Sequence, residues 1–237
     1  MAKVLAIIPA RAGSKGLKNK NIKLLNGKPL IGYTIMEAKK SKWISNIVVS
    51  TDSDEIASIS KQYGAEVPFI RPKEFSYDNS LTYDVVKHCI DFLNAKQDIY
   101  DIILLLQPTT PFRPFSSIDR AIEILLNDKS FDSVVSVVDV DGNHPNRMKV
   151  IKEGKLLNYV NQGFEDMRPR KELPKVYIRS GAIYAIRAQN FISEKSLVSK
   201  NCAPLMMNYE ETINIDNIND FNYCEFILKE KLNEDSN

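Results

Sequence analysis

Short apolar runs alternate with longer amphipathic stretches along most of the 237 residues. Runs with the length of buried strands lie at 4–8, 46–50, 102–106, 133–138 and 182–186. Stretches with apolar side chains at helical spacing lie at 30–40, 52–63, 81–93, 117–126 and 221–232. Strands that alternate with helices predict an α/β fold with a mostly parallel central sheet flanked by helices. The most apolar run, 102–106, is expected to be the central strand.

Weaker signals predict the remaining elements. Residues 66–70 are expected to form a short third strand, 72–80 a polar loop, and 206–208 a weakly extended segment. Asp52 precedes an amphipathic stretch and is followed by an acid three residues later, as in a capping box. We therefore interpret Asp52 as a helix cap rather than a catalytic acid. The tail at 233–237 is expected to be frayed.

The rhythm of strands and helices stops at 139–176. Asp-Gly at 141–142 and Glu-Gly at 153–154 favour hairpin turns, and a strand-like run lies between them at 148–151. We expect one domain, 1–237, in which residues 139–176 leave the sheet as a small antiparallel excursion.

The composition narrows the range of partners. The net charge is +2, from 32 basic and 30 acidic residues, so no charge strong enough to select nucleic acid or a membrane surface is expected. Three scattered cysteines, Cys89, Cys202 and Cys224, form no paired motif and indicate a reducing cytoplasm. The two histidines argue against a histidine-rich zinc site. No signal peptide or membrane span is expected, because no run approaches about 18 apolar residues.

Ligands of parallel α/β sheets bind beyond the carboxyl ends of the strands, which selects the loops after residues 8, 50 and 106. The first loop is small and basic, and its cations are Arg11, Lys15, Lys18 and Lys20. Gly13 and Gly16 allow its backbone to approach a ligand closely. Such a loop predicts phosphate binding, and the alternative is a solvated basic loop. The order Gly-Ser-Lys-Gly at 13–16 excludes both a Walker loop and the three-glycine dinucleotide motif.

The loop after the central strand reads Gln-Pro-Thr-Thr-Pro-Phe-Arg at 107–113. Its two prolines make it stiff. Gln107 can both donate and accept hydrogen bonds, as the edge of a pyrimidine base requires. The alternative is a rigid loop that only closes the end of the sheet. Arg113 is interpreted as a structural residue in a salt bridge at the sheet edge.

Together these stretches resemble the acylneuraminate cytidylyltransferases, the CMP-sialic acid synthetases. The resemblance rests on Ile-Pro-Ala-Arg-Ala-Gly-Ser-Lys-Gly-Leu at 8–17 with Lys-Asn at 20–21, and on matches at 49–56, 69–72, 107–113, 170–174 and 181–184. It covers nearly the whole chain with ordered spacing. The chain departs from the family at Ser180, where Asn is common, and at Asn214, where the family has the first Asp of a D-x-D motif.

The resemblance implies a nucleotidyltransferase that moves CMP from CTP to a nine-carbon 2-keto-3-deoxy acid sugar, such as N-acetylneuraminate or legionaminate, and releases pyrophosphate. The nucleotide-binding residues that it implies are Arg11, Ala12, Gly13, Ser14, Lys15, Lys20, Asn21, Arg71, Thr82, Gln107, Pro108 and Thr109. The implied sugar-binding residues are Gln107, Arg147, Arg170 and Ser180. Mg²⁺ is the implied cofactor, with Asp216 and Asn214 as ligands, and the implied catalytic residues are Arg11, Lys20 and Asp216.

The resemblance also implies a homodimer in which the excursion exchanges between subunits, and the alternative is a surface hairpin on a monomer. Asn214 and Asp216 have a structural alternative, in which they turn the chain into the last helix with Asp220 as its cap. Two other functions stay open. One is a nucleotidyltransferase that uses another base, such as GTP, with a related sugar, and the other is a non-catalytic nucleotide-binding module.

Overall fold

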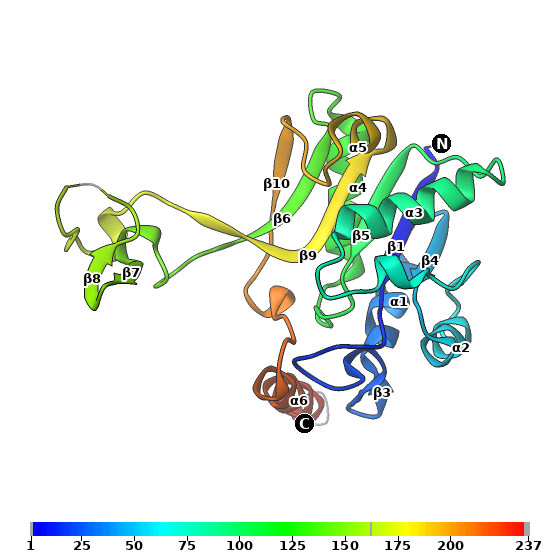
Figure 1. Ribbon diagram of the computed structural model, residues 1–237, viewed down its shortest axis with the longest axis horizontal. Helices are drawn as coiled ribbons and strands as arrows, with labels where there is room; N and C mark the ends of the chain where they lie inside the picture. Colours follow the sequence, from blue (N-terminus) through cyan, green and yellow to red (C-terminus); the bar gives the residue numbers. More distant parts are fainter. Residues whose placement is uncertain (1, 162, 235–237) are drawn as a thin grey trace.

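The computed structural model describes residues 2–161 and 163–234, which build a six-stranded central sheet (Figure 1). Its strands are β1 (Val4–Pro9), β4 (Asn46–Ser50), β5 (Ile102–Leu106), β6 (Ser133–Asp139), β9 (Tyr177–Arg187) and β10 (Cys202–Met206). Their order across the sheet is β10-β6-β9-β5-β1-β4. All neighbours pair in parallel except β9, which runs antiparallel to both β5 and β6. The mostly parallel sheet with β5 in its interior is confirmed.

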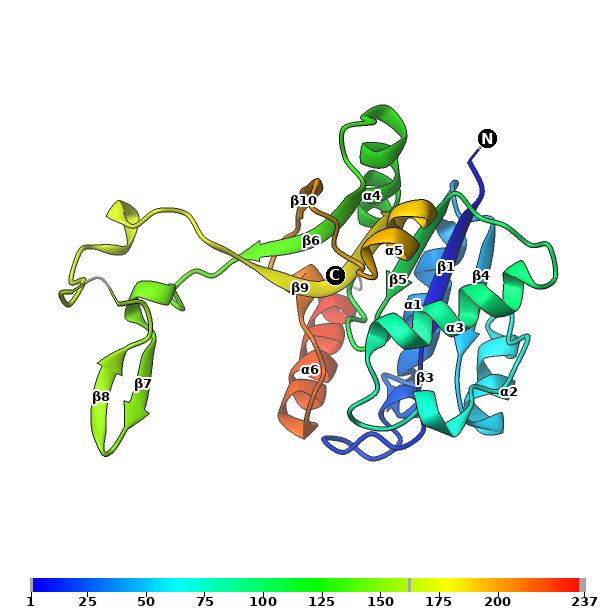
Figure 2. The same cartoon turned by 45° about the horizontal axis from the view of Figure 1, so that its top comes forward.

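Helices cover both faces of this sheet (Figure 2). They are α1 (Leu30–Lys40), α2 (Asp54–Gln62), α3 (Thr82–Asn94), α4 (Phe115–Asn127) and α5 (Ala188–Glu194). The last helix, α6 (Ile218–Glu234), packs instead in a separate cluster with Leu25 and Leu30. On β1, Val4, Ala6 and Ile8 pack with α1, α2 and α4, whereas Leu5 and Ile7 pack with α3 and α5. Because both faces of β1 are covered, polar groups can gather only beyond its ends. In the described part of the chain, no helix has the length and apolar character needed to cross a membrane.

Two local predictions are wrong. Residues 66–70, all of them described, form no strand and contribute only a single bridge to Val48. Helix α2 is capped by Ser53, whose hydroxyl accepts a hydrogen bond from the Ile56 amide at 3.3 Å. Asp52 is therefore not the cap, and its carboxylate has a different partner, in the first loop.

Several short elements escaped the sequence analysis. They are α5, most of β10, and a two-stranded hairpin of β2 (Leu24–Leu25) and β3 (Lys28–Pro29). Only 206–208 are predicted as extended near β10, because Pro204 interrupts the apolar pattern. The strand lies at the sheet edge, where a missing amide donor is tolerated. Of the tail predicted to fray, 233–234 belong to α6, and 235–237 lie outside the described residues.

The excursion stands away from the rest of the chain, joined to it by a neck in which β6 and β9 continue to pair (Figures 1 and 2). This pairing makes β9 longer than the predicted 182–186. Beyond the neck, β7 (Lys149–Lys152) and β8 (Lys155–Asn158) form an antiparallel hairpin. Its turn has positive φ at Glu153 (50°) and Gly154 (75°), as that dipeptide predicts. Asp-Gly at 141–142 forms a turn too, but it joins no paired strands of the described chain.

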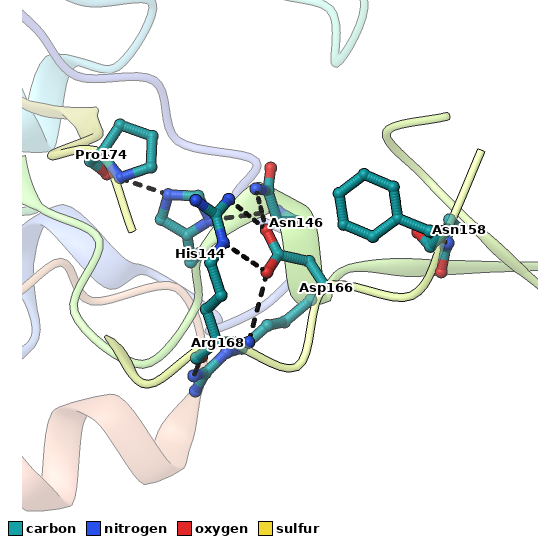
Figure 3. Close-up of polar contacts among 8 residues, drawn as sticks. His144, Asn146, Asn158, Asp166, Arg168 and Pro174 are labelled. Carbon is teal, nitrogen blue, oxygen red and sulfur yellow. Dashed lines mark hydrogen bonds and ion pairs between the residues drawn. The ribbon is translucent and has the colours of Figure 1, made fainter. Parts of the chain in front are cut away.

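A buried carboxylate joins the two chain segments of the excursion (Figure 3). Asp166 is 4% exposed and accepts hydrogen bonds from Arg168 Nε and Nη2 at 2.9 and 2.7 Å. The Asn146 side chain donates a third, at 2.8 Å. His144 Nδ1 accepts from the Asn146 amide at 3.1 Å, so neutral His144 donates from Nε2 to the Pro174 carbonyl at 3.0 Å. The excursion is therefore held by its own polar contacts rather than by the sheet core.

We expect Asp166→Asn to loosen the excursion without affecting the sheet, because it removes the charged acceptor of the Arg168 guanidinium. Hydrogen exchange followed by mass spectrometry should be faster in peptides covering 144–149 and 165–175, and unchanged in β1 and β5. Glu153→Gln, which neutralises an exposed carboxylate of the hairpin turn, is the matched control. Unchanged exchange in both excursion peptides would contradict this expectation.

The same contact has a defined pH dependence. The hydrogen bonds from Arg168 lower the pKa of Asp166. Its contribution to stability is therefore complete above the unfolded-state pKa of about 3.9, and it is lost as the pH falls from there toward the lower folded-state pKa.

Candidate functional site

A pocket of about 660 Å³ lies beyond the carboxyl ends of β1 and β5. It brings together twelve predicted site residues, Arg11, Ser14, Lys15, Lys20, Asn21, Arg71, Thr82, Gln107, Pro108, Thr109, Asn214 and Asp216. The lining also contains residues that the sequence analysis did not single out, Phe75, Tyr77, Asp78, Ser80 and Val85. Ala12 and Gly13 belong to the same first loop but are not among the lining residues. Two of the three loops selected by the strand-end rule, those after β1 and β5, line this pocket, and Asn214 and Asp216 line it as well. The loop after β4 does not line it and contacts the first loop through Asp52.

Two side chains fix the backbone of the first loop. The Asp52 carboxylate, just after β4, accepts a hydrogen bond from the Ala12 amide at 2.9 Å. Asn21 is 5% exposed and donates from its side chain to the Arg11 carbonyl at 3.0 Å. The loop is therefore preorganised by the neighbouring strand end, which is the function that Asp52 performs in place of capping α2. No local pattern distinguishes these two uses of an acid at the same position.

Three of the four cations of the loop, Arg11, Lys15 and Lys20, are already paired with acids. Arg11 Nη2 lies 2.5 Å from Asp78 Oδ1, and Lys15 forms an ion pair with the other oxygen of the same carboxylate. Lys20 donates to the Ile215 carbonyl at 2.8 Å and contacts Asp216 Oδ1 at 3.2 Å. Asp78 lies in the segment predicted only as a polar loop, and nothing local in the sequence connects it with the first loop.

Arg71 differs from these cations because it is buried. It is 4% exposed, it lines the pocket, and its Nε and Nη2 have no hydrogen-bond partner within the described residues. Burial is the main cause that lowers its pKa, opposed by Asp52 and reinforced by Arg11. A desolvated cation without partners destabilises the folded state, so its retention beside a pocket indicates an anionic ligand. Together with three further cations, it makes this pocket suitable for a polyphosphate.

The segment before α6 contributes Asn214 and Asp216 to the lining of the pocket. Asn214 Nδ2 donates to Asp216 Oδ2 at 2.5 Å, while Asn214 Oδ1 is buried without a partner among the described residues. Gly16 packs so closely that a Cβ there would lie 2.1 Å from the Asp216 carbonyl oxygen, which excludes any larger residue. The predicted cap is wrong, because Asp220 lies inside the first turn of α6 and Asn217 Oδ1, just before the helix, accepts a hydrogen bond from the Asp220 amide at 3.2 Å. Asp220 instead accepts a hydrogen bond from the Asp216 amide at 2.8 Å. This contact does not remove Asn214 and Asp216 from the pocket.

A buried arginine, Arg113, holds the loop at 107–113 in place by hydrogen bonds within the loop and to β9. Arg113 Nη1 donates to the carbonyl oxygens of Gln107 and Ala182 at 3.1 and 2.9 Å, and to Thr110 Oγ1 at 2.9 Å. The structural role predicted for Arg113 is present, but the predicted salt bridge is wrong, since these acceptors are neutral and no acid pairs with it in the described chain. Burial lowers its pKa to about 9, which leaves it charged at neutral pH. The Gln107 side chain is thereby presented to the pocket from a rigid loop.

Three predicted sugar-binding residues lie elsewhere. Arg147 donates to the Arg168 carbonyl at 3.1 Å, and Arg170 pairs with Asp141, all within the excursion. Ser180, in the neck, donates its hydroxyl to Ser136 Oγ at 2.7 Å. None of the three is among the residues that line the described pocket, and their contact with a sugar stays a prediction.

The chain is similar to several known proteins. Residues 5–231 match a protein family described as cytidylyltransferase. A CMP-N,N'-diacetyllegionaminic acid synthase from Legionella pneumophila is 38% identical over 231 residues, which cover 96% of this chain and 97% of the relative. An N-acylneuraminate cytidylyltransferase from Escherichia coli is 31% identical over 230 residues, 97% of this chain but 53% of the relative. A solved CMP:2-keto-3-deoxy-manno-octonic acid synthetase complexed with CTP has the same fold, with a TM-score of 0.70 at 16% identity over 97% of this chain and all of the other.

We expect Arg71→Met to separate stability from binding. Replacing a buried, unpartnered cation with an apolar side chain should leave the free energy of unfolding in urea unchanged or raise it by about 1–4 kcal/mol. Binding of tripolyphosphate, measured by calorimetry, should weaken by about 10-fold or more through loss of charged hydrogen bonds. Arg120→Met, on the exposed side of α4, is the control for net charge. A destabilised variant that binds tripolyphosphate normally would show that Arg71 is structural.

Proposed function

The chain belongs to the cytidylyltransferase family, and we propose that it transfers CMP from CTP to a nine-carbon 2-keto-3-deoxy acid sugar with release of pyrophosphate. The observation that carries the proposal is buried Arg71, without partners in the described chain, in a pocket that also holds Arg11, Lys15 and Lys20. The names of the Legionella and Escherichia coli relatives support a sugar of the legionaminate or N-acylneuraminate type. Free cysteines at 89, 202 and 224 support a reducing compartment such as the cytoplasm.

The proposed reaction is an in-line displacement at the α-phosphorus of CTP. The anomeric hydroxyl oxygen of the sugar bonds to that phosphorus and gives up its proton, while the bond to the bridging oxygen breaks and pyrophosphate leaves. Arg11, Lys15, Lys20 and Arg71 would neutralise the triphosphate and the charge that develops on the leaving group. Gln107, held by the rigid loop, would recognise the cytosine edge, with the Thr82 hydroxyl also facing the pocket.

The wall at 214–216 fits a Mg²⁺ ion, which we include in the proposal. The partnerless Oδ1 of Asn214 and the carboxylate of Asp216 are oxygen ligands of the kind that Mg²⁺ takes, alongside phosphate oxygens and waters. When bound, the ion would offset negative charge on the phosphate oxygens. The described residues contain no cluster of three or more His, Cys, Asp and Glu side chains able to hold a metal alone. The triphosphate itself would therefore have to supply further ligands.

We also propose that the protein acts as a homodimer. The excursion exposes large apolar side chains, Ile151 (77%), Leu156 (67%), Tyr159 (65%), Phe164 (58%) and Met167 (82%). Apolar surface on a projecting element is typical of a protein interface. Arg147 and Arg170 lie on the same excursion and are not among the residues that line the pocket of their own chain. A partner's excursion would bring these cations toward the acidic sugar.

The central test is pyrophosphate release with CTP, Mg²⁺ and a panel of acid sugars. We expect turnover with N-acetylneuraminate or legionaminate, and much less with the eight-carbon ketodeoxyoctonate. Replacing CTP with GTP should lower the rate by about 10–100-fold per lost base contact, since a buried pocket group is left unpaired. Equal turnover with GTP would favour a different base. CTP binding without pyrophosphate release from any sugar would favour a non-catalytic binding module.

The metal proposal makes opposite predictions for two variants. Asp216→Ala should remove most activity and raise the Mg²⁺ concentration needed for half-maximal rate. Asn214→Asp removes the amide that donates to Asp216 and puts a second carboxylate beside it, so Mg²⁺ should bind more tightly and raise the melting temperature more than in wild type. An Asp216→Ala enzyme with an unchanged rate and unchanged Mg²⁺ dependence would place the metal elsewhere.

The dimer proposal predicts complementation. Light scattering at assay concentration should give twice the mass of one chain. Arg170→Ala and Arg71→Met should each lower the activity when made alone. Mixing the two variants should restore part of the activity if each pocket uses the partner's excursion. A monomer by light scattering, or a dimer without any restored activity, would contradict the shared site.

A further inference from the structure

Asp78 is the shared partner of two cations in the pocket. One of its oxygens lies 2.5 Å from Arg11 Nη2, and the other pairs with Lys15. Hydrogen bonds from Lys15 and then Arg11 lower the pKa of this carboxylate, so it is ionised at neutral pH. The protein therefore places the Asp78 carboxylate on Arg11 and Lys15, the two more exposed cations of the pocket. The buried cation, Arg71, has no hydrogen-bond partner at Nε or Nη2 in the described chain.

The segment that carries Asp78 is tied mainly to itself. The Ser80 amide donates to the Tyr77 carbonyl at 3.1 Å, and the Tyr77 amide donates to Ser80 Oγ at 3.0 Å. Ser80 Oγ in turn donates to the Glu74 carbonyl at 3.2 Å. Asp78 lies at the middle of this turn, and the hydrogen bonds of the turn do not depend on its two ion pairs. Asp52 differs, because it holds the backbone of that loop at Ala12.

The ion pairs of Asp78 are exchangeable by their exposure. The side chains of Lys15 and Asp78 are 80% and 38% exposed, and pairs of this kind contribute little to stability. A polyphosphate presents several charges and many acceptor oxygens to the same cations, and it also reaches Arg71. It can therefore replace the single carboxylate of Asp78 on these cations. The ion pairs of Asp78 are then lost, and this loss reduces the net binding free energy of the polyphosphate. A nucleoside without phosphates does not compete for these cations at all.

We propose that Asp78 is a built-in competitor of the ligand's phosphate groups for Arg11 and Lys15, which lowers affinity for CTP and pyrophosphate while leaving the base contacts unaffected. This role rests on the proposed function, because it takes the ligand to be a nucleoside triphosphate. During turnover, Asp78 would pair again with Arg11 and Lys15 as pyrophosphate dissociates, which favours release of the product. Asp78 thus sets how strongly the pocket holds phosphate, rather than which base it selects.

Calorimetric binding of CTP, pyrophosphate and cytidine at one fixed Mg²⁺ and salt concentration tests this role. Asp78→Asn should bind CTP and pyrophosphate about 3–10-fold more tightly than wild type, with cytidine binding unchanged. Asp84→Asn, six positions further along on α3, makes the same change of charge and should bind like wild type. Unchanged or weaker CTP and pyrophosphate binding in Asp78→Asn overturns the competitor role. Wild-type protein that binds neither CTP nor pyrophosphate contradicts the proposed function itself, a result distinguishable from the failure of Asp78 alone.

Discussion

Positive charge concentrated at one end of an apolar sheet is the constraint around which this site is built. Arg11, Lys15, Lys20 and Arg71 converge where β1 and β5 end, and their mutual repulsion has to be offset. Three acids do so in different ways: Asp52 from the neighbouring strand end, Asp78 from a surface turn, and Asp216 from the segment before α6. Arg71 alone is left desolvated and without hydrogen bonds at Nε and Nη2 among the described residues, and this imbalance is what a polyanion would satisfy.

The antiparallel strand β9 links the site to the excursion. A bulge between Val135 and Val137 lets β9 bend out of the sheet into the neck, and Ser136 at the bulge bonds the Ile183 backbone and Ser180. Next to Ser180, Gly181 has a φ of 78°, and a Cβ there would lie 3.0 Å from Gln107 Oε1. The strand that positions the excursion therefore also packs against the side chain proposed to recognise the base.

Much of the fold could be predicted from the sequence, because its signals are local. The runs at 46–50 and 102–106 are strands with those bounds, and the turn of the excursion hairpin follows from a single dipeptide. The strand predictions that failed concern strands whose formation depends on pairing with distant segments. Residues 66–70 are apolar enough for a strand but obtain only one bridge, and β10 depends on pairing with β6, a strand far away in the sequence. Pairing across such distances is a property of the folded chain and has no local signature.

The candidate site divides in the same way. Loops suited to phosphate and base binding could be predicted after buried strands from the sequence alone, because apolar runs, prolines, glycines and cations are visible locally and strand ends share one edge. Only the tertiary structure decided which charges meet. Asp52 reaches Ala12 across 40 residues, Lys20 reaches Asp216 across 196, and Asp78 reaches Arg11 from a loop without any recognisable motif. An acidic residue in a sequence can cap a helix, hold the backbone of a loop or compete with a ligand for cations. Which of these roles it has depends on the cation or amide that folding places within a few ångströms of its carboxylate.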